Sequence, residues 1–239
     1  MSPFLRHRRR AFRVAPVSLP TDNLFAHYDA DATVIKDGGN AVSQWTDMSG
    51  NANHITQATG TKQPVWSDSV INGYPAIAFD GSDDYLKSSA FSTENNATVC
   101  VVIRKHTTHS GVLFDGNTNS SETLYFDSAT DRRIRTYAGG YGPWTNNGPE
   151  NNVWYFVIAR FQSSSLARLI CHNLETDTET EDRLGNIPSP SFTGITVGAQ
   201  GGGSAYLLDG DIAELAVYNE ATSDTKLITI KKYFRDRYV

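Results

Sequence analysis

Residues 42–54 read VSQWTDMSGNANH and residues 72–86 read NGYPAIAFDGSDDYL, and these two stretches decide the fold. In the second stretch, the apolar run Pro75–Phe79 has Asn-Gly-Tyr before it and Asp-Gly-Ser after it. A short apolar run between turn-forming residues is typical of a β-strand. The pattern therefore predicts short strands that are joined by tight turns.

The same pattern recurs through the chain. Apolar runs of strand length are separated by clusters of Gly, Asn, Asp and Ser, as in an antiparallel sandwich. The clearest predicted strands are Pro75–Phe79, Ala97–Arg104, Gly111–Phe114, Thr123–Phe126, Ile134–Tyr137, Val153–Phe161, Leu166–His172, Gly194–Val197 and Ile212–Tyr218. In residues 154–161 both alternating sets of side chains are apolar, so we expect this strand to be covered on both faces or to face a concave groove.

One helix is predicted near the C-terminal end. Ser223 is a good N-cap, and Asp224 in the first turn suits the positive end of the helix dipole. The apolar residues that follow at helical spacing are Leu227, Ile230, Phe234 and Tyr238. This spacing predicts a helix that packs one stripe against the sandwich.

Three motifs resemble a known family. Residues 45–51 (WTDMSGN), 79–86 (FDGSDDYL) and 209–215 (DGDIAEL) are similar to motifs of the laminin-G-like, concanavalin A-like lectin-glucanase jelly-roll domains. The resemblance implies an all-β, antiparallel concanavalin A-like jelly-roll sandwich with one short C-terminal helix. It implies less about activity, because the family includes lectins, adhesive modules, enzymes and virion proteins.

Charge divides the chain into two predicted parts. We interpret residues 1–23 as a basic N-terminal anchoring arm and residues 24–239 as the jelly-roll domain. The arginines of the arm are Arg6, Arg8, Arg9, Arg10 and Arg13. They suit an acidic groove on a partner protein. Residues 24–239 hold 16 basic and 25 acidic residues, a net charge of −9, which is unfavourable to broad nucleic-acid binding by the domain.

Other sequence features indicate in which cellular compartment the protein is found. An arginine and two prolines stand in the arm where a secretory signal would have its apolar region, so we expect no secretion signal. No apolar run reaches the length of about 18 residues that a membrane-spanning helix needs, so we expect no membrane partner. Cys100 and Cys171 lie in apolar runs and are predicted to be buried free thiols.

Residues 175–181 read ETDTETE, an acidic segment that allows two interpretations. Strict alternation would place four carboxylates on one face of a strand, and some glycoside hydrolases with this sandwich have a similar acidic strand in their groove. In those enzymes the residues between the acids are apolar, whereas here they are threonines. We therefore favour an exposed edge hairpin over a catalytic role for Glu175, Asp177 and Glu179.

A calcium ion is the one cofactor that the resemblance suggests, and we expect no cofactor to be required. Laminin-G-like domains often hold calcium at the rim of the sandwich with aspartate and carbonyl oxygens. Asp80, Asp84 and Asp209 are the candidate ligands here. The alternative is that Asp80 and Asp84 accept backbone hydrogen bonds within a tight turn.

Residues 139–152 are predicted to form a loop with a glycan-binding site. Tyr141 and Trp144 lie among Gly, Pro and Asn, where core residues are not expected. Sugar recognition needs an aromatic ring against the C–H face of the sugar and amides for its hydroxyls. Tyr141, Trp144, Asn146 and Asn147 offer both. The alternative is that Trp144 folds back and seals the edge of the sandwich.

We therefore predict a protein without enzymatic activity: a phage virion protein of the decoration, head-fibre or tail class. It would be assembled in the host cytoplasm and docked by its arm to a capsid, fibre or tail protein. Its outward-facing domain would bind host-surface or environmental glycans. The sequence is compatible with a monomer or a homo-oligomer. The alternatives are a polysaccharide hydrolase or lyase on the same sandwich, and a purely structural protein-binding module.

Overall fold

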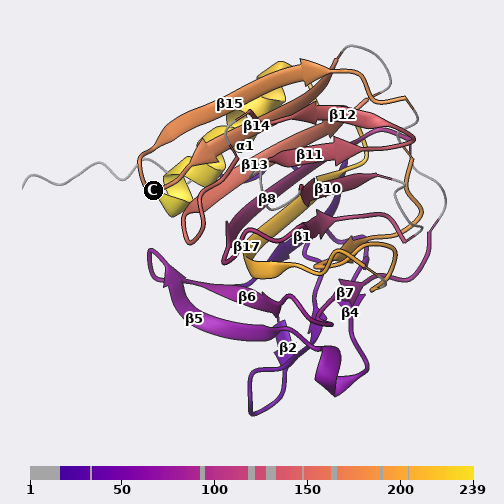
Figure 1. The fold of residues 1–239 in the computed structure, drawn as a ribbon, viewed down its shortest axis with the longest axis vertical. Helices are drawn as coiled ribbons and strands as arrows, with labels where there is room; N and C mark the ends of the chain where they lie inside the picture. Colours follow the sequence, from indigo (N-terminus) through magenta and orange to yellow (C-terminus); the bar gives the residue numbers. More distant parts are fainter. Residues whose placement is uncertain are drawn as a thin grey trace, which may run out of the picture.

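The computed structural model describes residues 17–32, 34–91, 95–117, 122–127, 133–146, 148–162, 166–188, 191–203 and 205–239. These residues form antiparallel sheets and one C-terminal helix, which confirms the predicted fold class. Figure 1 shows the sheets packed on one another with the helix at one side. All nine strands predicted above are present, with end points that differ by a few residues.

The strands belong to three sheets. The large sheet has the order β15 (Thr178–Gly185), β14 (Ala167–Asn173), β13 (Trp154–Phe161), β8 (Ala97–Lys105), β17 (Asp209–Tyr218), β6 (Tyr74–Asp80) and β5 (Val65–Ile71), and β1 (Leu24–Asp29) also pairs with β17. The small sheet has the order β12 (Tyr141–Trp144), β11 (Ile134–Tyr137), β10 (Thr123–Phe126) and β9 (Gly111–Phe114). The third sheet has the order β16 (Thr196–Val197), β7 (Leu86–Lys87), β4 (Ile55–Thr56), β3 (Val42–Trp45) and β2 (Val34–Lys36). A 3-10 turn η1 spans Gly60–Lys62, and helix α1 spans Asp224–Tyr238.

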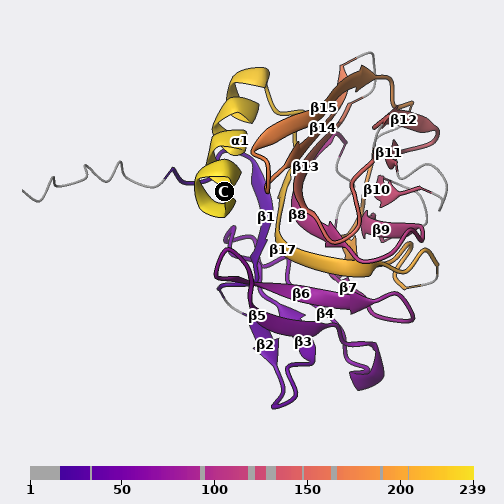
Figure 2. The ribbon, with the colours of Figure 1, turned by 60° about the vertical axis from the view of Figure 1, so that its left-hand side comes forward.

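The large sheet is covered on both faces. Val101 and Val157 lie in the main core with side chains of the other two sheets. Val102 and Phe156, which alternate with them, lie in a second core together with the apolar stripe of α1. In Figure 2, α1 lies on one side of the large sheet and β9–β12 on the other. Every residue of β13 is buried, so the expectation of a strand covered on both faces is confirmed.

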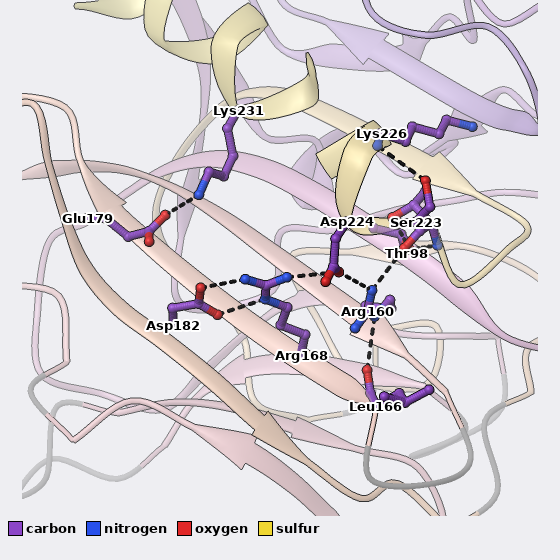
Figure 3. Close-up of polar contacts among 11 residues, drawn as sticks. Thr98, Arg160, Leu166, Arg168, Glu179, Asp182, Ser223, Asp224, Lys226 and Lys231 are labelled. Atoms are coloured by element: carbon purple, nitrogen blue, oxygen red, sulfur yellow. Dashed lines mark hydrogen bonds and ion pairs between the residues drawn. The ribbon is translucent and has the colours of Figure 1, made fainter. Parts of the chain in front are cut away.

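Helix α1 is attached firmly at its N-terminal end. The Ser223 side chain accepts a hydrogen bond from the backbone N–H of Lys226 at 3.2 Å, as expected of an N-cap. All four residues of the predicted stripe are buried. Figure 3 shows the Asp224 carboxylate against two arginines of the large sheet, 2.8 Å from nitrogens of both Arg160 and Arg168. The predicted helix is confirmed.

A buried carboxylate holds the C-terminal half of α1. Glu214 on β17 is fully buried and accepts hydrogen bonds from the Tyr233 hydroxyl at 2.7 Å and the Tyr238 hydroxyl at 2.8 Å. His27 Nε2 of β1 also lies 2.7 Å from it. Burial raises the pKa of both tyrosines, so they remain donors. We call these four residues the Glu214 cluster, which joins β1, β17 and α1.

The beginning of the chain is described from residue 17. Leu19 is buried in the second core, and the Tyr218 hydroxyl donates a hydrogen bond to the Pro20 carbonyl at 3.0 Å. The end of the predicted arm therefore packs on the domain, while its arginines lie outside the described residues. Cys100 and Cys171 are both buried and free, as predicted. Within the described part of the chain, no helix has the length and apolar character needed to cross a membrane.

Candidate functional site

The outer face of the small sheet carries aromatic side chains. On β10 Leu124 lies in the main core, so its neighbour Tyr125 points to the other face. On β11 Ile134 lies in the same core, so Arg135 and Tyr137 also point outward. An antiparallel sheet with one solvated face usually places small or charged polar residues there. Rings on this face therefore need an explanation.

Strand β12 adds two more rings through a bulge. Arg135 pairs with Trp144 and Tyr137 pairs with Tyr141, so a two-residue step on β11 faces a three-residue step on β12. The extra residue keeps both rings on the outer face. Tyr141 is 63% exposed and Trp144 is 44% exposed, so Trp144 does not fold back over the edge of the sandwich. The segment that was predicted to be a loop therefore contains a strand.

The exposed rings are held by Arg135. Its guanidinium carbon lies 5.1 Å from the ring centroid of Tyr141 and 5.8 Å from that of Trp144. Its Nε lies 2.6 Å from a carboxylate oxygen of Asp127. The rings of Tyr137 and Tyr141 are 5.5 Å apart and nearly perpendicular. Cation–π and edge-to-face contacts of this kind orient rings without covering them.

A first hollow of about 280 Å³ lies beside Tyr141. Its lining combines four tyrosines, three polar residues and one valine: Val112, Thr123, Tyr125, Asp127, Tyr137, Tyr141, Gln200 and Tyr206. Burial, and then the Asp127 carboxylate, raises the pKa of Tyr125, so this phenol keeps its proton. We call Tyr125, Tyr137, Tyr141, Trp144 and Tyr206 the aromatic surface.

A second hollow of about 420 Å³ lies on the other side of Tyr141, where β12 meets β15. It is lined by Tyr141, Gly142, Pro143, Trp144, Asn146, Arg183, Leu184, Gly185, Asn186 and Pro188. Gly142 allows β12 to pack closely here, because a Cβ atom would lie 2.4 Å from Thr136 Oγ1 and 2.5 Å from Ile187 Cγ1. Tyr141 therefore lines both hollows.

Three of the four predicted glycan-binding residues meet at these hollows. Tyr141 lines both hollows, Trp144 lines the second, and Asn146 is exposed at the second hollow, with its backbone N–H donated to Glu181 at 3.0 Å. Asn147 lies outside the described residues. Sequence reasoning missed Tyr125 and Tyr137, although alternation along two correctly predicted strands would have placed both on the outer face. It also missed Tyr206, which follows no periodic pattern.

The acidic segment belongs to an edge hairpin, the interpretation favoured from the sequence, and the strict alternation that would have placed its carboxylates on one face is broken. A bulge opposite Cys171 and His172 places Glu181 toward β12 and Glu179 toward α1. Glu179 lies 2.6 Å from Lys231, and Arg235 donates two hydrogen bonds to Asp177. These hydrogen bonds lower the pKa of Asp177 to about 2. Asp177 and Glu179 therefore pair with basic residues of α1.

The Asp80 corner differs from the predicted calcium site. Carboxylate oxygens of Asp80, Asp83 and Asp84 lie within 4.8 Å of one another, whereas Asp209 lies 3.2 Å from His106 Nδ1 and is not part of this group. Asp80 accepts the backbone N–H of Ser82 at 2.8 Å, and Asp84 accepts that of Asp80 at 3.1 Å. These contacts fit the tight turn. Burial, and then Asp80, raises the pKa of Asp84 to about 6.

Comparison with known proteins supports the fold. The model of the concanavalin A-like lectin/glucanases superfamily matches residues 80–227. No curated protein is significantly similar in sequence.

Among solved structures, the chain is similar to Trypanosoma rangeli sialidase in complex with sialic acid, with 13% identity and a TM-score of 0.59, over 92% of this chain and 34% of that one. It is also similar to an arabinofuranosidase complexed with arabinofuranosyl-α-1,2-xylobiose, with 14% identity and a TM-score of 0.63, over 90% of this chain and 59% of that one.

A third similar structure is a domain rather than a whole enzyme. It is domain 4 of AbnA, a GH43 extracellular arabinanase from Geobacillus stearothermophilus, in complex with arabinotriose. Identity is 15% and the TM-score is 0.55, over 91% of this chain and 98% of that one. The chain thus has the size of this one domain and spans about a third of the sialidase chain.

These likenesses correct one prediction. The exclusion of enzymatic activity from the sequence is wrong, because the similar structures come from glycoside hydrolases with the same fold. Identities of 11–15% show the shared fold and no more than that. Activity on a glycan is therefore a question for experiment.

Proposed function

Since this chain belongs to the concanavalin A-like lectin/glucanase superfamily, we propose that it binds a glycan on the aromatic surface of the small sheet. The observation that carries this proposal is the exposure of Tyr141 and Trp144 beside two hollows, with both rings oriented by Arg135. Large rings that are fixed in place yet left in contact with water mark a binding surface.

The lining of the first hollow suits a sugar. A sugar ring offers C–H groups on its faces, which pack on aromatic rings, and hydroxyls at its edge, which need donors and acceptors. Tyrosine supplies both through its ring and its O–H group. Tyr125 keeps its proton, and Gln200 adds an amide. Support also comes from the arabinanase domain of equal size, whose structure contains arabinotriose.

Affinity measurements on single variants test this proposal. The full-length protein would be screened against a panel of plant, bacterial and marine polysaccharides, and the strongest binder measured by titration calorimetry. We expect Tyr141→Ala and Trp144→Ala to weaken binding at least tenfold, while Ile228→Ala, an equally exposed apolar residue on α1, leaves it unchanged. Equal affinities for all three variants would contradict the proposal.

Glycan hydrolysis in the same place is a second candidate function. It is favoured by the fold shared with sialidase, arabinofuranosidase and arabinanase structures and by the Asp127 carboxylate in the first hollow. Glycoside hydrolysis commonly uses two carboxylates, one as acid and one as nucleophile or base. Release of reducing ends by the wild type and its loss in Asp127→Asn, with binding retained, would establish this activity. Binding without any released product would exclude it for the glycan tested.

The predicted virion setting is a separate proposal. Val17 and Leu19 pack in the second core beside α1, so the chain reaches the domain on the side of the large sheet away from the aromatic surface. A protein docked to a capsid, fibre or tail component through residues 1–16 would thus present the aromatic surface outward. Deletion of residues 1–16 should abolish attachment to the particle and leave glycan affinity intact. Unchanged occupancy on particles would contradict this setting.

A further inference from the structure

The position of Tyr141 gives information about the length of the ligand. This residue lines the first hollow with Tyr125, Tyr137 and Tyr206, and it lines the second hollow with Trp144 and Leu184. Its own ring is 63% exposed, so the two hollows are neighbours that share one exposed wall.

Each hollow alone is small for a glycan site. The volume of the first, about 280 Å³, lies just below the range of about 300–1,000 Å³ that is usual for small-molecule sites, and that of the second, about 420 Å³, lies near its lower end. A ligand that occupied both would bury considerably more of its surface than one that occupied either.

The second hollow extends the site to the edge of the molecule. It lies between β12, the edge strand of the small sheet, and β15, the edge strand of the large sheet. Figure 1 shows these two strands running close together. A Cβ atom at Gly185 of β15 would lie 3.0 Å from Pro143 of β12, so the two edges are in direct contact beneath the hollow. The second hollow therefore lies at the junction of the two sheet edges.

The charged groups in both hollows are already paired. Asp127 in the first lies 2.6 Å from Arg135, and Arg183 in the second lies 2.8 Å from Glu181. A sugar carboxylate would meet the Asp127 carboxylate in the first hollow and would have to displace Glu181 from Arg183 in the second, whereas the hydroxyls of a neutral sugar need only hydrogen bonds. The pairing favours an uncharged ligand.

We propose that the site binds a neutral, linear oligosaccharide whose chain crosses Tyr141 and occupies both hollows, so that it recognises an internal stretch of a polysaccharide in preference to a single terminal sugar. This inference rests on the proposed glycan binding. Beyond glycan binding itself, it specifies the length and charge of the ligand and its path across the site.

The test is a chain-length series. The full-length protein would be titrated with neutral linear oligosaccharides of arabinose and of xylose, from one unit to six, and with oligogalacturonates as charged counterparts. We expect affinity for a neutral series to rise at least tenfold between two and four units and then to level off. The charged series should bind at least tenfold more weakly at equal length.

Two variants separate the hollows. Leu184→Ala alters only the second hollow and Tyr206→Ala only the first, and both residues are more than half exposed, so the fold should tolerate either change. Each should remove most of the gain from chain length, while Ile228→Ala retains it. Melting temperatures of all variants control for folding.

The outcomes are distinct. Binding that is equally strong for one unit and for six, and is unaffected by Leu184→Ala, would overturn the two-hollow site and leave glycan binding intact. A stronger response to oligogalacturonates would overturn the neutral ligand. Failure of every glycan in the series and in the wider panel to bind would overturn the proposed function itself, and this inference with it.

Discussion

The two sides of the molecule use the same residue types for different purposes. Under α1, Tyr233 and Tyr238 are buried, and both hydroxyls donate to Glu214. On the aromatic surface, Tyr141 and Tyr206 are more than half exposed, although they lie against strands of the same sandwich. The comparison shows that a tyrosine indicates a structural or a binding role only through its burial and its partners.

The two sides also differ in the hydrogen-bond partners that they give to a buried carboxylate. Glu214 has three partners in its cluster. Glu122, which directly precedes β10 of the small sheet, is fully buried, and neither carboxylate oxygen has a hydrogen-bond partner among the described residues. Burial raises the pKa of Glu122 well above its ordinary value, so the native state favours its neutral form.

The largest expected effect is on stability, from the helix side. Glu214→Ala leaves His27, Tyr233 and Tyr238 without their shared partner, and at about 1–3 kcal/mol for each buried donor left unsatisfied we expect a loss of about 3–5 kcal/mol. For a chain of this size the melting temperature should fall by roughly 6–20 °C. Denaturant unfolding would measure the loss, with exposed Glu175→Ala as the control. A loss below about 1 kcal/mol would show that the cluster does not hold α1.

The second-largest expected effect is an increase in stability, from the substitution of Glu122. Because the native pKa of Glu122 is raised, the native state binds a proton that the unfolded state releases above about pH 4.3. The stability present below that pH is lost as the pH rises toward the native pKa. Glu122→Gln removes this penalty and should stabilise the protein by about 1–3 kcal/mol at pH 7 and by much less at pH 4.

Denaturant unfolding at the two pH values would check this prediction, with exposed Glu175→Gln as the matched control. Destabilisation by Glu122→Gln at pH 7, or an equal effect at both pH values, would show that Glu122 is paired after all. The contrast with Glu214 would then disappear.

The third effect separates binding from folding. Trp144→Ala should cost about 1.4 kcal/mol of glycan affinity, a factor of about ten, because it removes a ring that contacts the ligand. Its cost in stability should stay within about 0.5 kcal/mol, as is usual for exposed positions. A drop of many degrees in melting temperature would instead mark Trp144 as part of the core.

The smallest effect concerns the Asp80 corner. Three carboxylates whose oxygens lie within 4.8 Å repel one another, and a bound calcium ion would relieve this repulsion. We expect millimolar calcium to raise the melting temperature by a few degrees at most, and Asp84→Asn to abolish the shift. Asp37→Asn, at another turn held by an aspartate, is the control. No shift in the wild type would leave the turn as the sole role of this corner.

Much of the fold could be predicted because its signals are local. Apolar runs between turn-forming residues identified nine of the strands, and Ser223 with the spacing that starts at Leu227 identified α1. The bulges of β12 and β15 could not be predicted, because each depends on pairing with another strand. One places Tyr141 and Trp144 on the same face, and the other divides Glu179 from Glu181.

The site was therefore found only in part. Tyr141 and Trp144 were recognised from their polar, glycine-rich surroundings, which is a local signal. Tyr206 joins them from a distant segment through the packing of β9 against residues near β17. No spacing in the sequence brings it to the first hollow, and the same holds for Leu184 at the second hollow.

The most direct test is calorimetric titration of the wild type and of the double variant Tyr141→Ala/Trp144→Ala with the best-binding glycan, alongside their melting temperatures. A role in binding predicts a loss of affinity of about a hundredfold with a nearly unchanged melting temperature. Unchanged affinity in the double variant would contradict the account, because the glycan would then bind somewhere other than the aromatic surface.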